Sequence, residues 1–363
     1  MSKQDRIKDL EAEINKTQYN KATQHHIGLL KARIAKLKED IDTAKKGKGK
    51  QEGYVVKKAG DATVVMVGFP SVGKSTLLNG LTNANSKVAA YEFTTLTVIP
   101  GTLDYNHAKI QILDVPGIVQ GAADGTGRGK EVLSAVRSAD MALMILDINQ
   151  LHHLKIIKEE LNKTGLRINK EKPDIIIRKV PKGGISVSST VPLKIKKETI
   201  IGILNEFRIM NADVLIRSKV TEDDIIDCVE QNKKYIPGLI VINKIDTADP
   251  KKVAKLKTDH PGMVFISADK RENLEEVKEK IYEKLGFFRI YLKQPGKEAD
   301  MKEPLILKKP HTLRHVCLKL HKDFVLRFRF ARMWGKSVKY GGQKITNVDH
   351  NLRDEDIIEL HVK

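Results

Sequence analysis

Hydrophobic residues recur at helical spacing near the start of the chain. Ile7, Leu10 and Ile14 are three and four positions apart, and the same intervals return from Ile27 to Ile41 after a polar break. Residues at these intervals share one side of a helix. The pattern therefore predicts two helices, paired as a hairpin, followed by a flexible basic linker of Lys and Gly residues.

From residue 60 onward, short apolar strands alternate with helices. This alternation is typical of an α/β fold with a mostly parallel sheet, and such a sheet binds ligands at the carboxyl ends of its strands. We therefore expect candidate functional residues in the loops that follow the strands. The strands are expected at about residues 63–68, 96–105, 109–114, 141–148, 238–244 and 263–268.

The first of these strands runs into a glycine-rich stretch, GFPSVGKST. The pattern GxxxxGK[ST] is that of a phosphate-binding loop, whose backbone N–H groups and following helix hold polyphosphate. We expect Lys74 to reach the β- and γ-phosphates as a catalytic group, and Ser75 to bind Mg²⁺. Nucleotide contacts are predicted for Gly68, Pro70, Ser71, Val72, Gly73, Lys74, Ser75 and Thr76.

Two later loops have the composition of nucleotide-sensing switches. Thr95, within YEFTTLT, is predicted to complete the Mg²⁺ coordination only when a γ-phosphate is present. Asp114 ends an apolar strand and is predicted to hold Mg²⁺, and Gly117 is predicted to donate its N–H to the γ-phosphate. Ile118 stands where Ras-like proteins have the glutamine that orients the attacking water, so hydrolysis is expected to be slow or to use another group.

Two further motifs predict recognition of guanine. Asn243, Lys244 and Asp246 form an NKxD box after an apolar strand. The Asp246 carboxylate can accept hydrogen bonds from the N1–H and 2-amino groups of guanine, a donor pair that adenine lacks. Ser267 and Ala268 follow the next strand and are predicted to supply the last base contact. Four boxes in the required order predict a GTPase that converts GTP to GDP and phosphate with Mg²⁺.

The spacing of the boxes predicts two further domains. A long stretch separates the strand at 141–148 from the NKxD box, and its pattern indicates an inserted ββαβ unit. Strands around one helix in the last part of the chain indicate a β-grasp module. We divide the chain into a helical region with a basic linker (1–60), a G domain (61–164 and 221–286), an inserted α+β domain (165–220) and a β-grasp domain (287–363).

Positive charge is concentrated outside the predicted G domain. The formal net charge of the chain is +19. Residues 1–60, 165–220 and 287–363 carry +7, +7 and +8, whereas the remainder carries −3. Three basic regions around a slightly acidic core favour a polyanionic partner, with RNA ahead of a membrane because no amphipathic anchor or lipidation signal accompanies them.

The last domain also contains aromatic residues interleaved with basic ones. Two interpretations stay open. The aromatic residues form a face on which RNA bases stack, or they belong to the core while the basic residues face solvent on the other side of a strand. The residues are Phe328, Phe330 and Trp334 among Arg327, Arg329, Arg332 and Lys336.

Cysteine usage and hydropathy exclude other classes of protein. Cys228 and Cys317 are far apart and belong to no CxxC pair, which excludes a zinc site of the usual spacing and favours a reducing compartment. The purely apolar runs are too short to span a bilayer, and the first residues alternate in charge rather than forming a targeting segment. We therefore expect a cytoplasmic protein with no membrane partner.

The motifs GFPSVGKST, YEFTTLT, DVPGIVQGAADGTGRGKE and NKID, with the amino-terminal NKATQHHIGLLKARIAKLK, resemble the developmentally regulated GTP-binding protein (DRG) family of the Obg branch. The resemblance covers nearly the whole chain. It implies a helical amino-terminal region, a G domain, an inserted domain like the second domain of a small-subunit ribosomal protein, and a carboxy-terminal TGS domain of β-grasp form. It also implies a role at ribosomes, with a stabilising partner protein.

Two positions qualify the resemblance. Ile118 is similar to the hydrophobic residue that replaces the catalytic glutamine across this branch. Related potassium-dependent GTPases carry Asn where this chain has Ser71, a departure that weakens the case for potassium as a cofactor.

The leading hypothesis is a GTP-hydrolysing switch that binds the ribosome or ribosomal RNA through its basic regions in one nucleotide state. Two alternatives remain open. One is an RNA-binding scaffold with a structural G domain, and the other is a signalling GTPase whose partners are proteins only.

Overall fold

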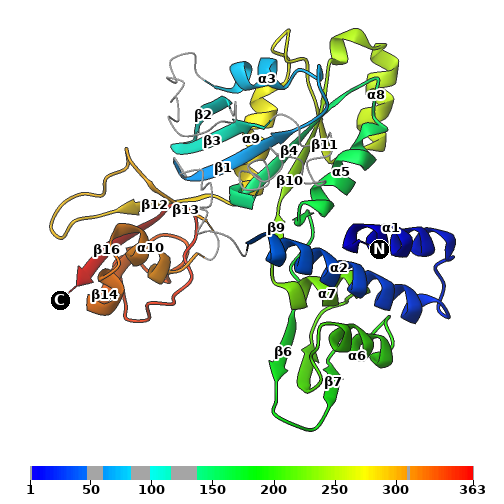
Figure 1. Cartoon of the computed structure of the whole chain (residues 1–363). Coiled ribbons are helices and arrows are strands. Elements are labelled where there is room, and N and C mark those ends of the chain that lie inside the picture. The colour runs from blue at the N-terminus through cyan, green and yellow to red at the C-terminus, as the bar shows by residue number, and fades with distance from the viewer. Residues whose placement is uncertain (1, 47–59, 83–98, 116–136, 309–310, 363) are drawn as a thin grey trace. The chain divides into compact units, whose positions relative to one another are not determined.

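The computed structural model describes residues 2–46, 60–82, 99–115, 137–308 and 311–362 (Figure 1). The chain forms two compact units. One unit comprises Met1–Gly53 with Lys170–Tyr235, and the other comprises Tyr54–Asn169 with Ile236–Lys363. Two short strands, β5 (Leu166–Ile168) and β9 (Lys234–Ile236), fall where the chain passes from one unit to the other. No described helix has both the length and the apolar character needed to cross a membrane.

The second unit contains the predicted α/β sheet, and the α/β fold class is confirmed. Its six strands lie in the order β11-β10-β4-β1-β3-β2, all parallel except β2, which pairs antiparallel with β3. A large parallel sheet of this kind buries both faces, so its central strands β1, β4 and β10 are almost entirely apolar. The strands are β1 (Ala62–Val67), β2 (Ile99–Tyr105), β3 (Ala108–Asp114), β4 (Met141–Asp147), β10 (Gly238–Asn243) and β11 (Met263–Phe265).

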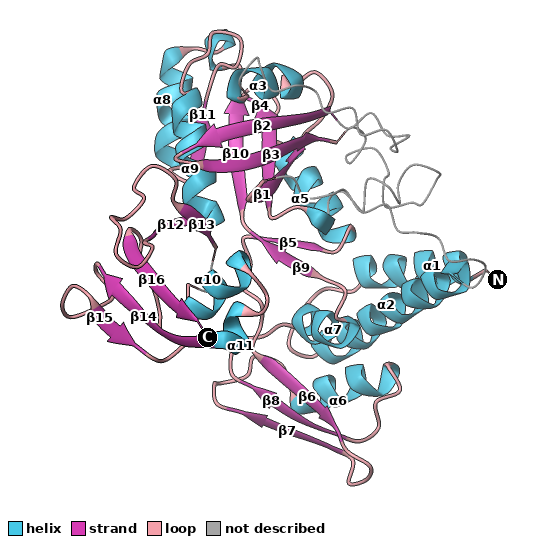
Figure 2. Ribbon diagram, turned by 90° about the vertical axis from the view of Figure 1, so that its left-hand side faces the viewer, coloured by secondary structure: helices cyan, strands magenta, loops and turns pink. Residues whose placement is uncertain are grey.

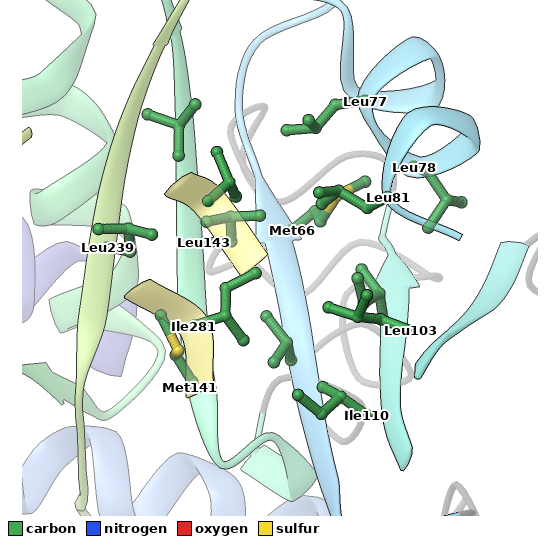
Figure 3. Packing of buried hydrophobic residues seen from close by; sticks show 14 of the residues in the cluster. Met66, Leu77, Leu78, Leu81, Leu103, Ile110, Met141, Leu143, Leu239 and Ile281 are labelled. Carbon is green, nitrogen blue, oxygen red and sulfur yellow. The ribbon is translucent and has the colours of Figure 1, made fainter. Parts of the chain in front are cut away.

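Helices pack on both faces of this sheet. Successive residues of β1 point to opposite faces, and since all of them are apolar or buried, each face has a core of its own. Val64 and Met66 belong to the cluster that includes buried residues of α3 (Lys74–Leu81) and α9 (Leu274–Leu285), part of which Figure 3 shows. Val65 and Val67 belong to the opposite cluster, with residues of α5 (His153–Lys163) and α8 (Pro250–Asp259). The amino ends of α3 and α5 follow strands β1 and β4.

The same unit contains a second sheet near the end of the chain, in the order β13-β12-β16-β14-β15 (Figure 2). α10 (Leu313–Leu320) packs on one face, since its Leu313 and Val316 are buried in one cluster with Ile290, Met333 and Ile358. The short helix α11 (Phe324–Arg327) precedes β14. The strands are β12 (Phe288–Leu292), β13 (Leu305–Leu307), β14 (Phe328–Trp334), β15 (Gln343–Ile345) and β16 (Asp356–Val362).

The first unit combines the amino-terminal helices with the inserted segment. Its three-stranded sheet has the order β6-β8-β7, and its elements follow the ββαβ order predicted from the sequence. The sheet is followed along the chain by α7 (Glu222–Glu230), which begins with a capping box at Thr221. The other elements are α1 (Lys3–Lys16), α2 (Gln24–Lys46), β6 (Ile175–Lys179), β7 (Ile185–Ser189), α6 (Lys197–Glu206) and β8 (Ala212–Ile216).

Helix α2 packs against α6, a contact that the sequence pattern did not predict. Ala32 is completely buried in one cluster with Ile200 and Ile203 of α6. A Cβ atom added at Gly28 would lie 3.0 Å from the Thr199 methyl group, so the two helices approach closely at this glycine. The side of α2 that carries Gly28 and Ala32 is therefore buried against the inserted segment.

Candidate nucleotide-binding site

The predicted phosphate-binding loop connects β1 to α3. Gly73 has φ 90° immediately before the helix, and a Cβ atom there would lie 2.4 Å from Asn243 Nδ2. Both the backbone conformation and the close approach therefore require glycine. The Lys74 ammonium group donates to the carbonyl oxygens of Gly68, at 3.0 Å, and Phe69, at 2.9 Å, so its side chain lies across the loop. Burial lowers the pKa of Lys74, and the Asp114 carboxylate opposes this shift.

The two described residues predicted to bind Mg²⁺ lie side by side. Ser75 Oγ donates to Asp114 Oδ2 at 3.2 Å. Asp114 is 6% exposed, and its Oδ1 atom is buried without a hydrogen-bond partner among the described residues. A buried carboxylate oxygen with no partner, beside a serine hydroxyl, fits a site for a hard cation such as Mg²⁺. The described residues contain no cluster of three or more metal-ligating side chains. Thr95 and Gly117 lie outside the described residues, as does Ile118.

Asn243 joins two of the predicted boxes to each other. Its Nδ2 atom donates to the Val72 carbonyl oxygen at 2.8 Å, and its Oδ1 atom accepts from the Ala268 N–H at 2.9 Å. The side chain is buried, so both hydrogen bonds are protected from water. The Ala268 N–H, which belongs to the box predicted to supply the last base contact, is thus engaged by Asn243. Ser267 is also buried, and its hydroxyl accepts from the Lys270 N–H.

Lys244 has a partner that sequence analysis missed. Its ammonium group lies 2.9 Å from Asp147 Oδ2, and the other carboxylate oxygen of Asp147 accepts from the Asn149 N–H. Burial raises the pKa of Asp147, but the hydrogen bonds from Lys244 and Asn149 outweigh it and lower the pKa below its ordinary value. A signal was present in the sequence, because Asp147 ends the apolar strand β4 as Asp114 ends β3.

The predicted base-reading residue is open to solvent. Asp246 lies in a short 3₁₀ helix (Ile245–Thr247) directly after Lys244, and it is exposed. Lys244 itself has φ 65°, a left-handed conformation that turns the chain sharply after β10. The turn separates the buried amide of Asn243 from the exposed carboxylate of Asp246. One residue of the box thus braces the loops, and another remains available to a ligand.

Comparisons with known proteins identify the family of the chain. Developmentally-regulated GTP-binding protein 1 of Xenopus laevis is 46% identical over 360 residues, which cover 98% of each chain. The chain belongs to the DRG family. Developmentally-regulated G-protein 3 of Arabidopsis thaliana is 44% identical, over 98% of this chain and 97% of its own. An uncharacterized GTP-binding protein of Methanocaldococcus jannaschii is 54% identical, over 100% of this chain and 94% of its own.

Family models match most of this DRG chain. A model described as a 50S ribosome-binding GTPase matches residues 63–179, and a model of the C-terminal region of that domain matches residues 182–287. A TGS domain model matches residues 288–362. The chain is therefore a GTP-binding protein of a GTPase family, with a P-loop GTPase domain and a carboxy-terminal TGS domain, as the sequence motifs predicted.

The solved structures that match are more distant in sequence. The YchF GTPase of Schizosaccharomyces pombe has 14% identity and a TM-score of 0.47, with 84% of this chain and 99% of that one covered. Likeness at this level carries no argument about activity.

Proposed function

We propose that this DRG chain is a GTP-hydrolysing switch that acts on the ribosome. In this proposal it binds ribosomal RNA through its basic regions in one nucleotide state and leaves after hydrolysis. The observation that carries the nucleotide part is Asn243, which joins the phosphate-binding loop to the last guanine box through two buried hydrogen bonds. A pocket assembled in this way supports ligand binding with little reorganisation.

The phosphate and metal contacts in this proposal belong to the loop after β1 and to the two switches. The residues of the loop from Gly68 to Thr76 bind the phosphates, with the Lys74 ammonium group exchanging its two carbonyl partners for phosphate oxygens. Ser75 and Asp114 supply oxygen atoms to Mg²⁺, and Thr95 completes the set in the GTP state. When bound, Mg²⁺ neutralises charge on the β- and γ-phosphate oxygens.

The base contacts in this proposal belong to the NKxD and last boxes. Asp246 selects guanine through two accepted hydrogen bonds, Lys244 covers the base while Asp147 positions its ammonium group, and the loop at Ser267 and Ala268 closes the pocket. Hydrolysis is slow in the protein alone, because Ile118 has no group that can orient water and Gly117 offers only a backbone N–H.

We retain the remaining expectations as parts of the same proposal. They are a cytoplasmic location, a stabilising partner protein, no membrane partner, and a division into a helical region, a G domain, an inserted domain and a TGS domain at the boundaries predicted above. The positive charge of the regions outside the G domain and the description of the matching GTPase family support RNA of the ribosome as the target. Potassium is the least supported cofactor, because position 71 is serine.

Co-sedimentation with ribosomes tests the switch. The full chain is mixed with ribosomes in GDP and in a non-hydrolysable GTP analogue, and a Ser75→Asn variant is the matched control that cannot use the analogue productively. We expect wild-type protein to pellet more strongly in one nucleotide and the variant to lose that difference. Equal pelleting of wild type in both nucleotides would favour a scaffold, and no pelleting in either would favour a signalling protein with protein partners.

A further inference from the structure

The five-stranded sheet of the TGS domain has one face that α10 does not cover. Ala331 and Met333 of β14 point into the core beneath α10. Because side chains alternate along a strand, Phe330, Arg332 and Trp334 point to the opposite side. We call this side the open face of the TGS sheet. The register adds His361 opposite Phe330 and Lys344 opposite Arg332.

The aromatic rings on the open face are already in contact with other side chains. The His361 ring stacks on Phe330 with a centroid distance of 4.2 Å and an interplanar angle of 16°, and Lys344 Nζ lies 4.5 Å from the Phe330 centroid. Lys293 Nζ lies 4.6 Å from the Trp334 centroid. The third aromatic residue of the sequence pattern, Phe328, packs against the core instead. The rings therefore hold cations in place, an interaction favoured by the negative charge above an aromatic face.

The turn after β14 also restricts Trp334. A Cβ atom added at Gly341 would lie 2.8 Å from Trp334 Cδ1, so this glycine lies against the indole. Gly342 approaches the six-membered part of the indole in the same way, at 3.5 Å from Cζ2. With Lys293 and the glycine turn both in contact with the indole, a nucleobase would have to displace existing contacts in order to stack there.

A buried carboxylate fixes some of these cations and leaves others without an acidic partner. Glu359 is 5% exposed; it accepts from Lys293 at 3.0 Å, and His361 Nε2 lies 2.8 Å from its other oxygen. Arg332 and Lys344 are exposed and face each other across β14 and β15. Glu359 lies opposite Arg332 on the other side, in β16, but its two oxygens are engaged by Lys293 and His361, and neither Arg332 nor Lys344 forms an ion pair within the described part of the chain. Like charges placed directly opposite are unfavourable in a sheet, and an anion between them would relieve the repulsion.

We propose that the open face binds the sugar–phosphate backbone of RNA through Arg332 and Lys344, without stacking bases on Phe330 or Trp334. This proposal rests on the proposed function, from which it takes RNA as the class of partner. What it adds is the part of the RNA that is contacted, the phosphates. A surface that contacts only phosphates gains affinity from charge and is insensitive to base sequence. The aromatic rings position the lysine side chains rather than touch the RNA.

Binding of the full chain to 20-nucleotide oligo(U) and oligo(A), measured by fluorescence anisotropy over a range of KCl concentrations, tests this proposal. An Arg332→Gln/Lys344→Gln double variant removes two phosphate contacts. The slope of log K against log salt should then flatten by about 1.4, and affinity near 0.1 M salt should fall by about 25-fold, equally for both oligonucleotides. Phe330→Leu should change affinity less than about twofold.

A Lys297→Gln/Lys302→Gln variant is the matched control, because it removes the same charge from exposed residues between β12 and β13. It should alter the slope by less than half as much as the double variant. If the wild-type chain shows no salt-dependent RNA binding, the proposed function fails. If wild type binds but the double variant keeps its slope, or if Phe330→Leu weakens oligo(A) and oligo(U) binding unequally, the open-face proposal alone is wrong.

Discussion

The nucleotide-binding end of the G sheet and the open face of the TGS sheet both present cations, but they hold them by different means. Lys74 donates to two backbone carbonyl oxygens, and Lys244 is paired with the Asp147 carboxylate. Lys344 instead lies over the Phe330 ring, while Lys293 lies over the Trp334 ring and also donates to Glu359. Oxygen acceptors fix the direction of each N–H bond, whereas a ring attracts the charge without directing its hydrogen bonds.

This difference matters for what each region can recognise. A site whose groups are fixed by directional hydrogen bonds suits a ligand of one shape, such as a guanine nucleotide. A cation held over a ring, such as Lys344, suits a repeating anion whose exact position varies, such as a phosphate backbone. Four substitutions separate the two modes, and we give them in order of expected effect.

Asn243→Ala should have the largest effect. The change leaves the buried Val72 carbonyl and Ala268 N–H without partners, and each such group costs about 1–3 kcal/mol. We expect unfolding by urea to report a loss of about 2–4 kcal/mol, and GTP affinity to fall by about 30-fold, the equivalent of about 2 kcal/mol. Asn149→Ala, an exposed change beside the same pocket, should stay within about 0.5 kcal/mol of wild type. Similar losses for the two variants would contradict a bracing function for Asn243.

Asp246→Asn should change which base the site prefers and leave the stability of the fold unchanged. The amide can donate to the 2-oxo group of xanthine but loses the acceptor for the guanine donors, and hydrogen bonds to a charged group are worth about 1.5–3 kcal/mol. GTP affinity should fall about 10-fold to 100-fold and XTP affinity should rise, as measured by competition with a fluorescent nucleotide. Asp249→Asn is the matched control, since asparagine caps a helix as well as aspartate does. A GTP to XTP ratio unchanged in Asp246→Asn would show that the NKxD assignment is wrong.

Glu359→Gln tests the charge network of the open face. Burial raises the pKa of Glu359, but hydrogen bonds from Lys293 and His361 outweigh it and lower the pKa. A lowered folded-state pKa contributes stability that is present above the unfolded pKa and is lost as the pH falls through the folded pKa. We expect the variant to be about 1 kcal/mol less stable at pH 7. The difference from wild type should shrink as the pH falls below the unfolded pKa and vanish below the lowered folded pKa. Thermal unfolding from pH 3 to pH 7 measures this, and a difference that grows in acid would overturn it.

Asp147→Asn should have the smallest effect. The Lys244 side chain is 35% exposed, and ion pairs near the surface contribute about 0.2–1 kcal/mol. GTP affinity should therefore fall about twofold to fivefold at low salt, and the loss should shrink as salt is raised. Isothermal titration at two salt concentrations tests this, and a loss that is independent of salt would mean that Asp147 acts through the loop backbone rather than through Lys244.

Much of the nucleotide site in the G domain could be predicted because its residues lie in short, contiguous sequence motifs. Gly73 and Lys74 are adjacent in the chain, and Asp246 lies three residues after Asn243, so local sequence was enough to predict their roles. Asp147 escaped prediction because its partner Lys244 is distant in sequence and becomes a neighbour only through the pairing of β4 with β10. The two interpretations of the TGS aromatic residues could not be separated for the same reason, since the face to which Phe330 points depends on the register of β14 and β16.

The packing of α2 against α6 has a consequence for synthesis of the chain. Ala32 leaves the ribosome early, but its buried neighbours Ile200 and Ile203 follow about 170 residues later, which takes roughly ten to thirty seconds at 5–20 residues per second. During that time the side of α2 that carries Leu29 and Ala32 lacks its partner α6, and segments exposed in this way are prone to aggregate. A helper that covers Gly28, Leu29 and Ala32 on nascent chains would therefore raise the yield of folded protein without contributing to the stability of the finished fold.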